Sequence, residues 1–68
     1  MKKFAERFKE LRKEHNFSQG EVAIRLCVSS SVVCYWETNR TEPTAPNIVK
    51  IAELFGVSSD YLLGLKDD

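Results

Sequence analysis

Several classes of protein are excluded by what this sequence lacks. It has only two cysteines, which allow one disulfide at most, so it is not a disulfide scaffold. No run of apolar residues approaches the roughly 20 that a membrane-spanning helix needs. The N-terminus, Met1-Lys2-Lys3, leads into a charged segment and lacks the apolar core of a signal peptide. We therefore expect a soluble, cytoplasmic protein that does not act at a membrane.

The chain is also short for an enzyme. Its 68 residues correspond to a single domain, residues 1–68. A chain of this length buries only about 60 % of the surface that its unfolded form exposes. Little room is left for a deep cleft, and the single histidine has no positioned nucleophile beside it. We expect no catalysis, no cofactor and no small-molecule substrate.

Three residues, His15, Cys27 and Cys34, raise the question of a metal or redox site. A structural zinc site needs four ligands, whereas these three residues are scattered and form no CxxC pair. No metal site is predicted. We expect Cys27 to be a small buried side chain and Cys34 to be a surface or half-buried thiol.

The formal net charge of zero hides a difference between the two halves of the chain. Residues 1–40 hold eight Lys or Arg and five Glu, a balance of +3, whereas residues 41–68 hold two Lys and five acidic residues, a balance of −3. Such asymmetry indicates a side that faces a polyanion. A chance distribution over solvated helix faces explains it as well.

Apolar side chains recur at helical spacing, and no long segment alternates with the period of a strand. The pattern predicts five helices, over residues 3–15, 19–26, 30–37, 45–55 and 59–63. A residue that can cap the helix precedes each of the last four: Ser18, Ser29, Thr44 and Ser58. Glu21 completes a capping box with Ser18, and Asn16, Gly56 and Gly64 suit the left-handed positions that end helices. The predicted core comprises Phe4, Phe8, Leu11, Val22, Ala23, Leu26, Val28, Val33, Trp36, Ile48, Ile51, Ala52 and Phe55.

The second and third predicted helices have the spacing of a helix-turn-helix, with the motif over about residues 19–38. Two helices that cross steeply need a small residue at the crossing, and Ala23 stands there. The turn favours a residue with positive φ, usually glycine. Cys27 occupies it instead, a departure that costs about 1 kcal/mol.

Beyond this spacing, longer stretches of the chain match a known family. They are Phe8-Lys9-Glu10-Leu11-Arg12, Phe17-Ser18-Gln19, Leu26-Cys27-Val28-Ser29, Tyr35-Trp36-Glu37, residues 50–58 and Tyr61-Leu62-Leu63. In these residues the chain resembles the phage-repressor-like (Cro/XRE-type) helix-turn-helix domains of bacteria and their phages. The match covers about residues 4–64. It implies an all-α, compact five-helix bundle of the lambda-repressor-like type, which binds double-stranded DNA as a dimer and usually regulates transcription.

The resemblance also implies which residues meet DNA. Helix 30–37 would enter the major groove, with base contacts from its outer face: Ser30, Ser31, Val32 and Tyr35. Phosphates would be contacted by Gln19, Ser29, Thr38, Asn39 and Arg40, with Asn39 at a place where the family often has Gly. Arg12 and Glu37 match a pair that forms a partly buried ion pair, and we favour this structural role for Arg12 over a DNA contact.

The predicted reading face lacks the side chains that discriminate bases best. Arg or Lys on guanine and Asn or Gln on adenine each contribute about 1–3 kcal/mol of discrimination, and helix 30–37 has none of these residues on its outer face. We therefore expect modest specificity that leans towards A·T, supplemented by DNA shape and dimer spacing.

An apolar cluster near the C-terminus suggests a second copy of the chain as a partner. Leu62 and Leu63 are expected to cover the core, which leaves Tyr61 and Leu65 for a homodimer interface. Packing of these two side chains on their own chain is the alternative.

Together these observations predict a sequence-specific DNA-binding transcriptional regulator. The form we expect is a repressor that occupies a palindromic operator as a homodimer, without chemistry of its own. One alternative is an antitoxin-type regulator that binds a toxin as well as DNA. Another is a protein-interaction module that has kept the fold and lost DNA binding, which the neutral charge and the serine-rich helix favour. Salt-dependent DNA binding distinguishes this module from the regulators.

Overall fold

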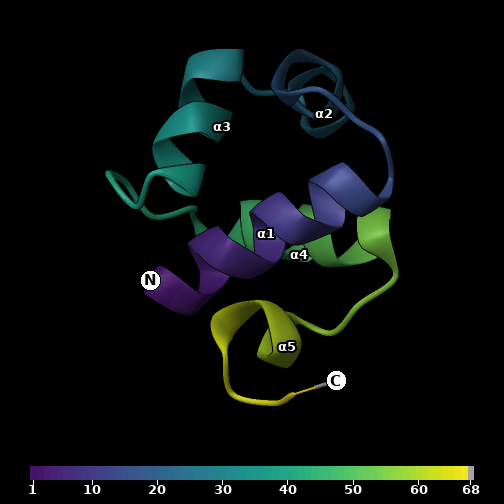
Figure 1. The fold of residues 1–68 in the computed structure, drawn as a ribbon. Coiled ribbons are helices and arrows are strands. Elements are labelled where there is room, and N and C mark those ends of the chain that lie inside the picture. The colour runs from purple at the N-terminus through teal and green to yellow at the C-terminus, as the bar shows by residue number, and fades with distance from the viewer. Residues whose placement is uncertain (68) are drawn as a thin grey trace.

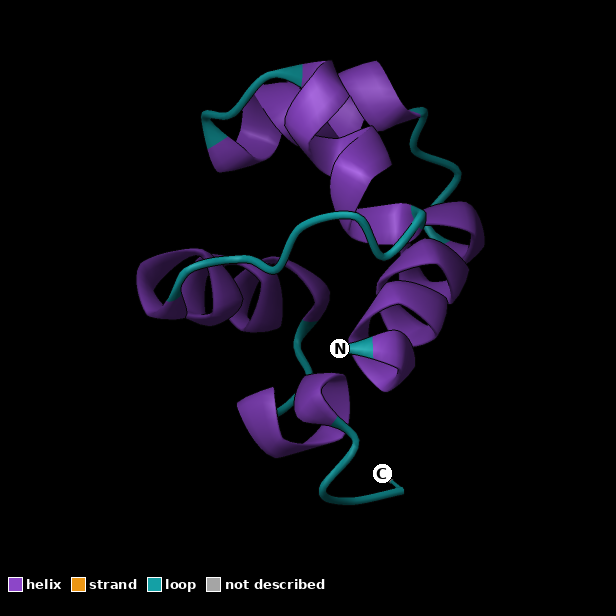
Figure 2. Cartoon of the chain, turned by 90° about the vertical axis from the view of Figure 1, so that its left-hand side faces the viewer, coloured by secondary structure: helices purple, strands orange, loops and turns teal. Residues whose placement is uncertain are grey.

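The computed structural model describes residues 1–67 and is built from helices. They are α1 (Lys2–Glu14), α2 (Gln19–Leu26), α3 (Ser30–Glu37), α4 (Ala45–Phe55) and α5 (Ser59–Leu63). No strand occurs within residues 1–67. In Figure 1, α2 and α3 form the upper part of the molecule, α1 lies in front of α4 across the middle, and α5 lies below. Figure 2, turned by 90°, keeps these three levels and separates α1 from α4.

The predicted all-α, five-helix architecture is confirmed, and the predicted bounds of the last four helices agree with the structure. The first helix begins at Lys2 rather than at residue 3 and ends at Glu14, with His15 as its C-cap. The backbone N–H of His15 still donates to the Leu11 carbonyl oxygen, at 3.1 Å. None of the helices in the described part of the chain is both long and apolar enough to cross a membrane.

Side-chain caps explain why the helices start where they do. The four predicted cap residues each accept a hydrogen bond from the backbone N–H three residues later: Ser18, Ser29, Thr44 and Ser58. Ser18 and Glu21 form the complete capping box, because the Ser18 backbone N–H also donates to the Glu21 carboxylate, at 2.9 Å. This bond and the Ser18 hydroxyl, with nearby Arg25, hold the pKa of Glu21 below its usual range.

The core sits between α1, α4 and the α2–α3 pair. Phe8 of α1 occupies its centre, with the Trp36 ring edge-on at 5.7 Å between centroids and the Phe55 ring at 6.1 Å. Phe4 stacks on Phe8 at 5.5 Å. Most of the predicted core residues are buried, whereas Val28 and Ala52 are half-buried at its edge. Leu62 brings α5 into the same core and is fully buried.

The expectation of a buried Cys27 was wrong, because this side chain is exposed. Cys27 is the left-handed C-cap of α2, with φ of 59°. A residue in this conformation ends the helix and turns its side chain out of the motif. Val28 is the turn residue that packs against the core instead. Cys34 is half-buried, as predicted.

Arg7 holds the end of α5 against α1. Its guanidinium donates to the backbone carbonyl oxygens of Tyr61 and Lys66. The same group lies 4.2 Å from the centroid of the Tyr61 ring and 3.5 Å from a carboxylate oxygen of Asp67. One cation of α1 thus binds the last turn of α5 and the residues that follow it, where the helix dipole favours positive charge.

Gly64 allows this close approach of α5 to α1. Its φ is 80°, and a Cβ built on it would lie 2.7 Å from the Cβ of Lys3. Cβ atoms in proteins essentially never lie within 3.0 Å of such an atom, so one of the two residues would have to move. Glycine at residue 64 is therefore required both by the backbone conformation and by the contact with α1.

We predict that Gly64→Ala lowers the free energy of unfolding by about 1–3 kcal/mol, because left-handed strain and the Lys3 contact act together. Urea denaturation measures the change. Gly20→Ala is the matched control, since a Cβ at Gly20 meets only the Ser18 hydroxyl, at 3.9 Å. That control should be neutral or stabilise the fold by up to about 1 kcal/mol. Equal midpoints for the two variants would contradict the prediction.

Candidate nucleic-acid interface

The α2–α3 pair forms one end of the molecule. In Figure 1, α2 is seen nearly down its axis, whereas α3 lies in the plane of the view and runs from top to bottom, so the two helices cross steeply. Ala23 of α2 is buried, with Val22 and Leu26 on the same helix and Val33 on α3. The small side chain at residue 23 fits the expected crossing. Packing of the inner faces leaves the outer face of α3 open to a partner.

That outer face is polar and accessible. Ser30 and Ser31 are exposed in the first turn of α3, and Tyr35 is 38 % exposed one turn later. Ser29 is exposed as well, although its hydroxyl already accepts the Val32 backbone N–H as the cap of α3. Val32 differs from the other predicted base-contacting residues, because its side chain is half-buried and packs against the core.

The loop after α3 presents the second group of predicted DNA contacts. Thr38, Asn39 and Arg40 are all exposed. Asn39 has φ of 61°, which accounts for an asparagine where the resembling family often has glycine. The Arg40 guanidinium lies 4.8 Å from the centroid of the Tyr35 ring, so the loop and α3 offer one continuous surface. Sequence reasoning did not predict this contact, although the two residues lie only five apart across the helix end.

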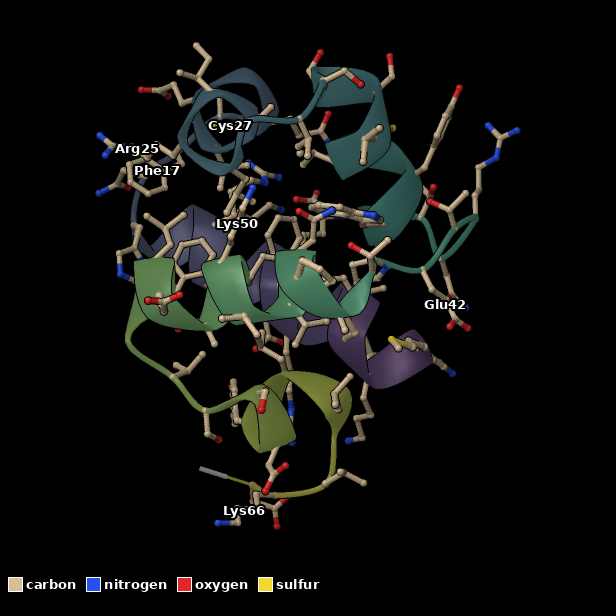
Figure 3. The ribbon with its side chains drawn as sticks, turned by 180° about the vertical axis from the view of Figure 1, so that it is seen from behind. Phe17, Arg25, Cys27, Glu42, Lys50 and Lys66 are labelled. Carbon is tan, nitrogen blue, oxygen red and sulfur yellow. The ribbon has the colours of Figure 1, made fainter. Side chains whose placement is uncertain are left out.

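The α-amino group of Met1 connects this loop to the start of α1. It donates to Asn39 Oδ1 at 3.2 Å and lies 3.5 Å from a carboxylate oxygen of Glu42. Figure 3 shows Glu42 on the loop at the edge of the molecule. No sequence pattern indicated this contact, because the residues are 38 and 41 positions apart.

The N-terminus of α2 supplies a third group of donors. The capping box satisfies the backbone N–H groups of Ser18 and Glu21. The N–H groups of Gln19 and Gly20, in the same first turn, have no acceptor within an α-helix by its geometry. They point out of the positive end of the helix, where an anion such as a phosphate is favoured.

Beneath these surfaces lies the predicted ion pair of Arg12 and Glu37. Arg12 Nε donates to one Glu37 carboxylate oxygen at 2.6 Å, and a terminal nitrogen of Arg12 donates to the other at 3.1 Å. The Glu37 side chain is 2 % exposed and that of Arg12 is 11 % exposed. The other terminal nitrogen of Arg12 donates to the Phe17 carbonyl oxygen at 2.8 Å. The pair therefore joins α1, α3 and the linker that leads into α2.

Gln19 also reaches this pair. Its Nε2 donates to Glu37 Oε1 at 3.2 Å, and the residue is half-buried. The family resemblance predicts a phosphate contact for Gln19 and does not predict this link to Glu37. Gln19 and Glu37 lie 18 positions apart and on different helices. The spacing of residues along a single helix therefore does not reveal their contact.

At the edge of α2, Arg25 adds positive charge. Its guanidinium lies 4.6 Å from the centroid of the Phe17 ring, and Figure 3 shows the two side chains together on that flank. Lys50 of α4 extends towards α2 in the same view. Cations thus flank the α2–α3 pair, although its outer face is nearly uncharged.

The two residues predicted for a dimer interface differ in accessibility. Tyr61 is half-buried and lies beneath Arg7, whereas Leu65 is 72 % exposed. A second apolar surface, which sequence reasoning did not identify, is an open hollow of about 330 Å³. It is lined by Met1, Pro43, Ala45, Ile48, Val49, Ser59 and Leu63.

No group of three His, Cys, Asp or Glu side chains that could hold a metal ion occurs in residues 1–67. Cys27 and Cys34 are both free thiols.

Comparisons with known proteins place this geometry among regulators. A family model described as helix-turn-helix matches residues 8–62. The chain is similar to two proteins of Bacillus subtilis (strain 168). It is 32 % identical over 65 residues to the uncharacterized HTH-type transcriptional regulator YobD, a match that covers 96 % of this chain and 58 % of that protein. It is 34 % identical over 62 residues to the HTH-type transcriptional regulator ImmR, with 91 % and 48 % covered. The chain thus spans about half the length of these relatives.

Two solved structures have a similar fold. The P22 c2 repressor in complex with a synthetic operator has a TM-score of 0.83 at 29 % identity, and the match covers 87 % of this chain and 89 % of that one. The solution structure of the DNA-binding domain of the P22 c2 repressor has a TM-score of 0.81 at 30 % identity, with 88 % and 79 % covered.

The buried ion pair generates a stability prediction. Arg12→Met should lower the free energy of unfolding by about 3–5 kcal/mol, because Glu37 then keeps a buried charge without its partner. Urea denaturation followed by circular dichroism measures the change. Lys9→Met, at an exposed position of the same helix, is the control and should change stability by less than about 0.5 kcal/mol. A small effect of Arg12→Met, comparable with that of the control, would show that the pair is dispensable.

Proposed function

The chain belongs to the helix-turn-helix family, and from this premise we propose that it is a sequence-specific DNA-binding repressor of transcription. It places α3 in the major groove of double-stranded DNA and blocks polymerase by occupying the site. The observation that carries the proposal is the exposed polar face of α3 between two groups of donors suited to phosphate. We further place its action in the cytoplasm, the compartment that holds bacterial DNA.

The base contacts in this proposal come from the outer face of α3. Ser30 and Ser31 can hydrogen-bond to either kind of base, and the Tyr35 ring can meet a thymine methyl group. Val32 contributes only the part of its side chain that the core leaves free. Since these groups discriminate bases weakly, the intrinsic specificity is modest and leans towards A·T, and DNA shape supplies the remainder.

The phosphate contacts come from both ends of the motif. The first turn of α2 offers the backbone N–H groups of Gln19 and Gly20 and the Gln19 side chain. Beyond α3, Thr38, Asn39 and Arg40 approach the backbone on the other side. Ser29 contributes its hydroxyl at the start of α3. Arg40 is the cation among these residues, so the salt-dependent part of binding depends strongly on it.

We predict that the affinity for random-sequence duplex DNA falls by orders of magnitude between about 50 and 200 mM salt, because bound phosphates release counterions. A fluorescence-anisotropy titration at several salt concentrations gives the slope of log affinity against log salt. Arg40→Ala should weaken binding and reduce that slope by about 1.

Lys66→Ala is the control for this titration, since Lys66 lies at the opposite end of the molecule from α3 (Figure 3). It should leave the slope unchanged. Absence of DNA binding at the lower salt concentration would refute the proposal. The fold would then serve a protein-interaction module, the alternative that the neutral net charge favours. An antitoxin-type regulator would bind DNA in this titration and would bind a protein partner in addition.

We also propose that the repressor acts as a homodimer on a palindromic operator. Two copies of α3 then lie about one DNA turn, roughly 34 Å, apart. Leu65, with the accessible part of Tyr61, forms the contact expected from the sequence. The hollow between α4 and α5, with exposed Val49 on its wall, offers a second copy a further apolar surface.

Selection of binding sites from random duplexes should recover an inverted repeat of two A·T-rich half-sites centred about 10 base pairs apart. Leu65→Glu and Val49→Glu, measured separately by analytical centrifugation on the selected duplex, identify the surface that joins the copies. Lys9→Gln, at an exposed position of α1 with no assigned DNA contact, changes the net charge by the same amount and is the control. A strongly G-dependent motif would refute the A·T preference, and one chain per duplex for the unmodified protein would refute the dimer.

A further inference from the structure

We propose that Glu37 is a positioning residue for the DNA backbone, because it orients the side-chain amide of Gln19 before DNA arrives. This inference rests on the proposed function and assigns a binding role to a residue that makes no DNA contact itself. Glu37 is the last residue of α3, and Gln19 is the first residue of α2. Their hydrogen bond, 3.2 Å from Gln19 Nε2 to Glu37 Oε1, is the only one that joins the side chains of α2 and α3 within residues 1–67.

The Glu37 carboxylate is itself held rigidly. Arg12 donates to both of its oxygens, at 2.6 and 3.1 Å, and the side chain is 2 % exposed. A two-pronged contact of this kind sets the plane of the carboxylate as well as its position. Arg12 therefore fixes the position of the Glu37 Oε1 atom that accepts the hydrogen bond from Gln19.

The geometry of an amide transmits this constraint. Both N–H groups of Nε2 lie in the plane of the amide. When one of them donates to Glu37, the direction of the other is set with it. The second N–H is left for a ligand at the start of α2, where the backbone N–H groups of Gln19 and Gly20 have no acceptor within the helix. The three donors together suit one phosphate.

Orientation in advance improves binding through entropy. A free glutamine side chain loses rotamer freedom when a partner immobilises it, and that loss of entropy opposes binding. Because the bond to Glu37 already immobilises the Gln19 side chain when the protein folds, this loss of entropy no longer opposes DNA binding. Because Glu37 ends α3, the same bond also fixes the place of the phosphate contact relative to the helix that enters the groove.

A double-mutant cycle tests the proposal with a random-sequence duplex of about 20 base pairs at about 50 mM salt. The proteins are the unmodified chain, Glu37→Gln, Gln19→Met and the double variant. Glutamine at residue 37 keeps one acceptor oxygen and replaces the other with an NH2 donor, so it cannot accept from both nitrogens of Arg12 and hold Gln19 as the carboxylate does. Methionine at residue 19 keeps the length of the side chain and removes its donors.

We expect Glu37→Gln to lower DNA affinity about three- to tenfold when Gln19 is present. In the Gln19→Met background the same substitution should change affinity by less than about twofold. Glu10→Gln, at an exposed position of α1, controls for the change of one charge and should leave affinity unchanged. Circular dichroism establishes that each variant is folded at the temperature of the titration.

An equal loss in both backgrounds would overturn the proposal, because Glu37 would then act on the fold and not through Gln19. No DNA binding by the unmodified chain would overturn the proposed function together with this inference. If the Glu37→Gln variant is unfolded, the proposal is tested instead by nuclear magnetic resonance of the Gln19 side-chain amide in the unmodified chain. The Gln19 Nε2 protons should be as motionally restricted as the backbone before DNA is added, and a freely moving amide would refute the assignment.

Discussion

The ion pair between Arg12 and Glu37 is the constraint on which the arrangement of the first three helices depends. A carboxylate that is almost fully removed from water must keep a charged, hydrogen-bonded partner, since removal of one partner from a buried pair costs several kcal/mol. Arg12 meets that need and also binds the Phe17 carbonyl oxygen. Helix α1 therefore holds the end of α3 and the start of α2 at once. The aromatic contacts of Phe8 with Trp36 and Phe55 fill the space beneath, but they are less directional.

This constraint separates the tasks of the two faces of the motif. The inner face of α2 and α3 consists of apolar side chains and the buried pair, which set the angle between the helices. The outer face is free to carry small polar residues such as Ser30 and Ser31, because it contributes little to the core. A surface with one cation, Arg40, and several backbone donors suits the shape and charge of a nucleic-acid backbone better than the identity of bases, in line with the proposed function.

Much of this structure followed from the sequence, because the determinants of the helices are local. A capping serine or threonine fixes where a helix begins by satisfying an N–H within three residues, and all four such positions were predicted correctly. The ion pair came from the family resemblance, which carries tertiary information. Cys27 was placed wrongly because its apolar character suggested burial, whereas its backbone conformation decided the outcome.

Other features lay beyond sequence reasoning because they join residues that are distant along the chain. The Gln19–Glu37 bond and the contact of the Met1 amino group with Asn39 do not follow from any spacing pattern along the sequence. Tyr61 is of a residue type that is common at interfaces, and only the fold reveals that the Arg7 guanidinium already lies over its ring. The base-contacting and phosphate-contacting residues remain predictions, since their partners are not part of the chain.

The hydrogen bonds of Arg7 hold the main chain at the end of α5 and just after it, and not the side chains there. The guanidinium binds carbonyl oxygens of Tyr61 and Lys66, which every amino acid possesses. Substitutions among these residues therefore change the side chains displayed around Leu65 while the main chain stays in place. The exposed surface around Leu65 is thus free to change its side chains, and with them its contacts, without a change in the main chain.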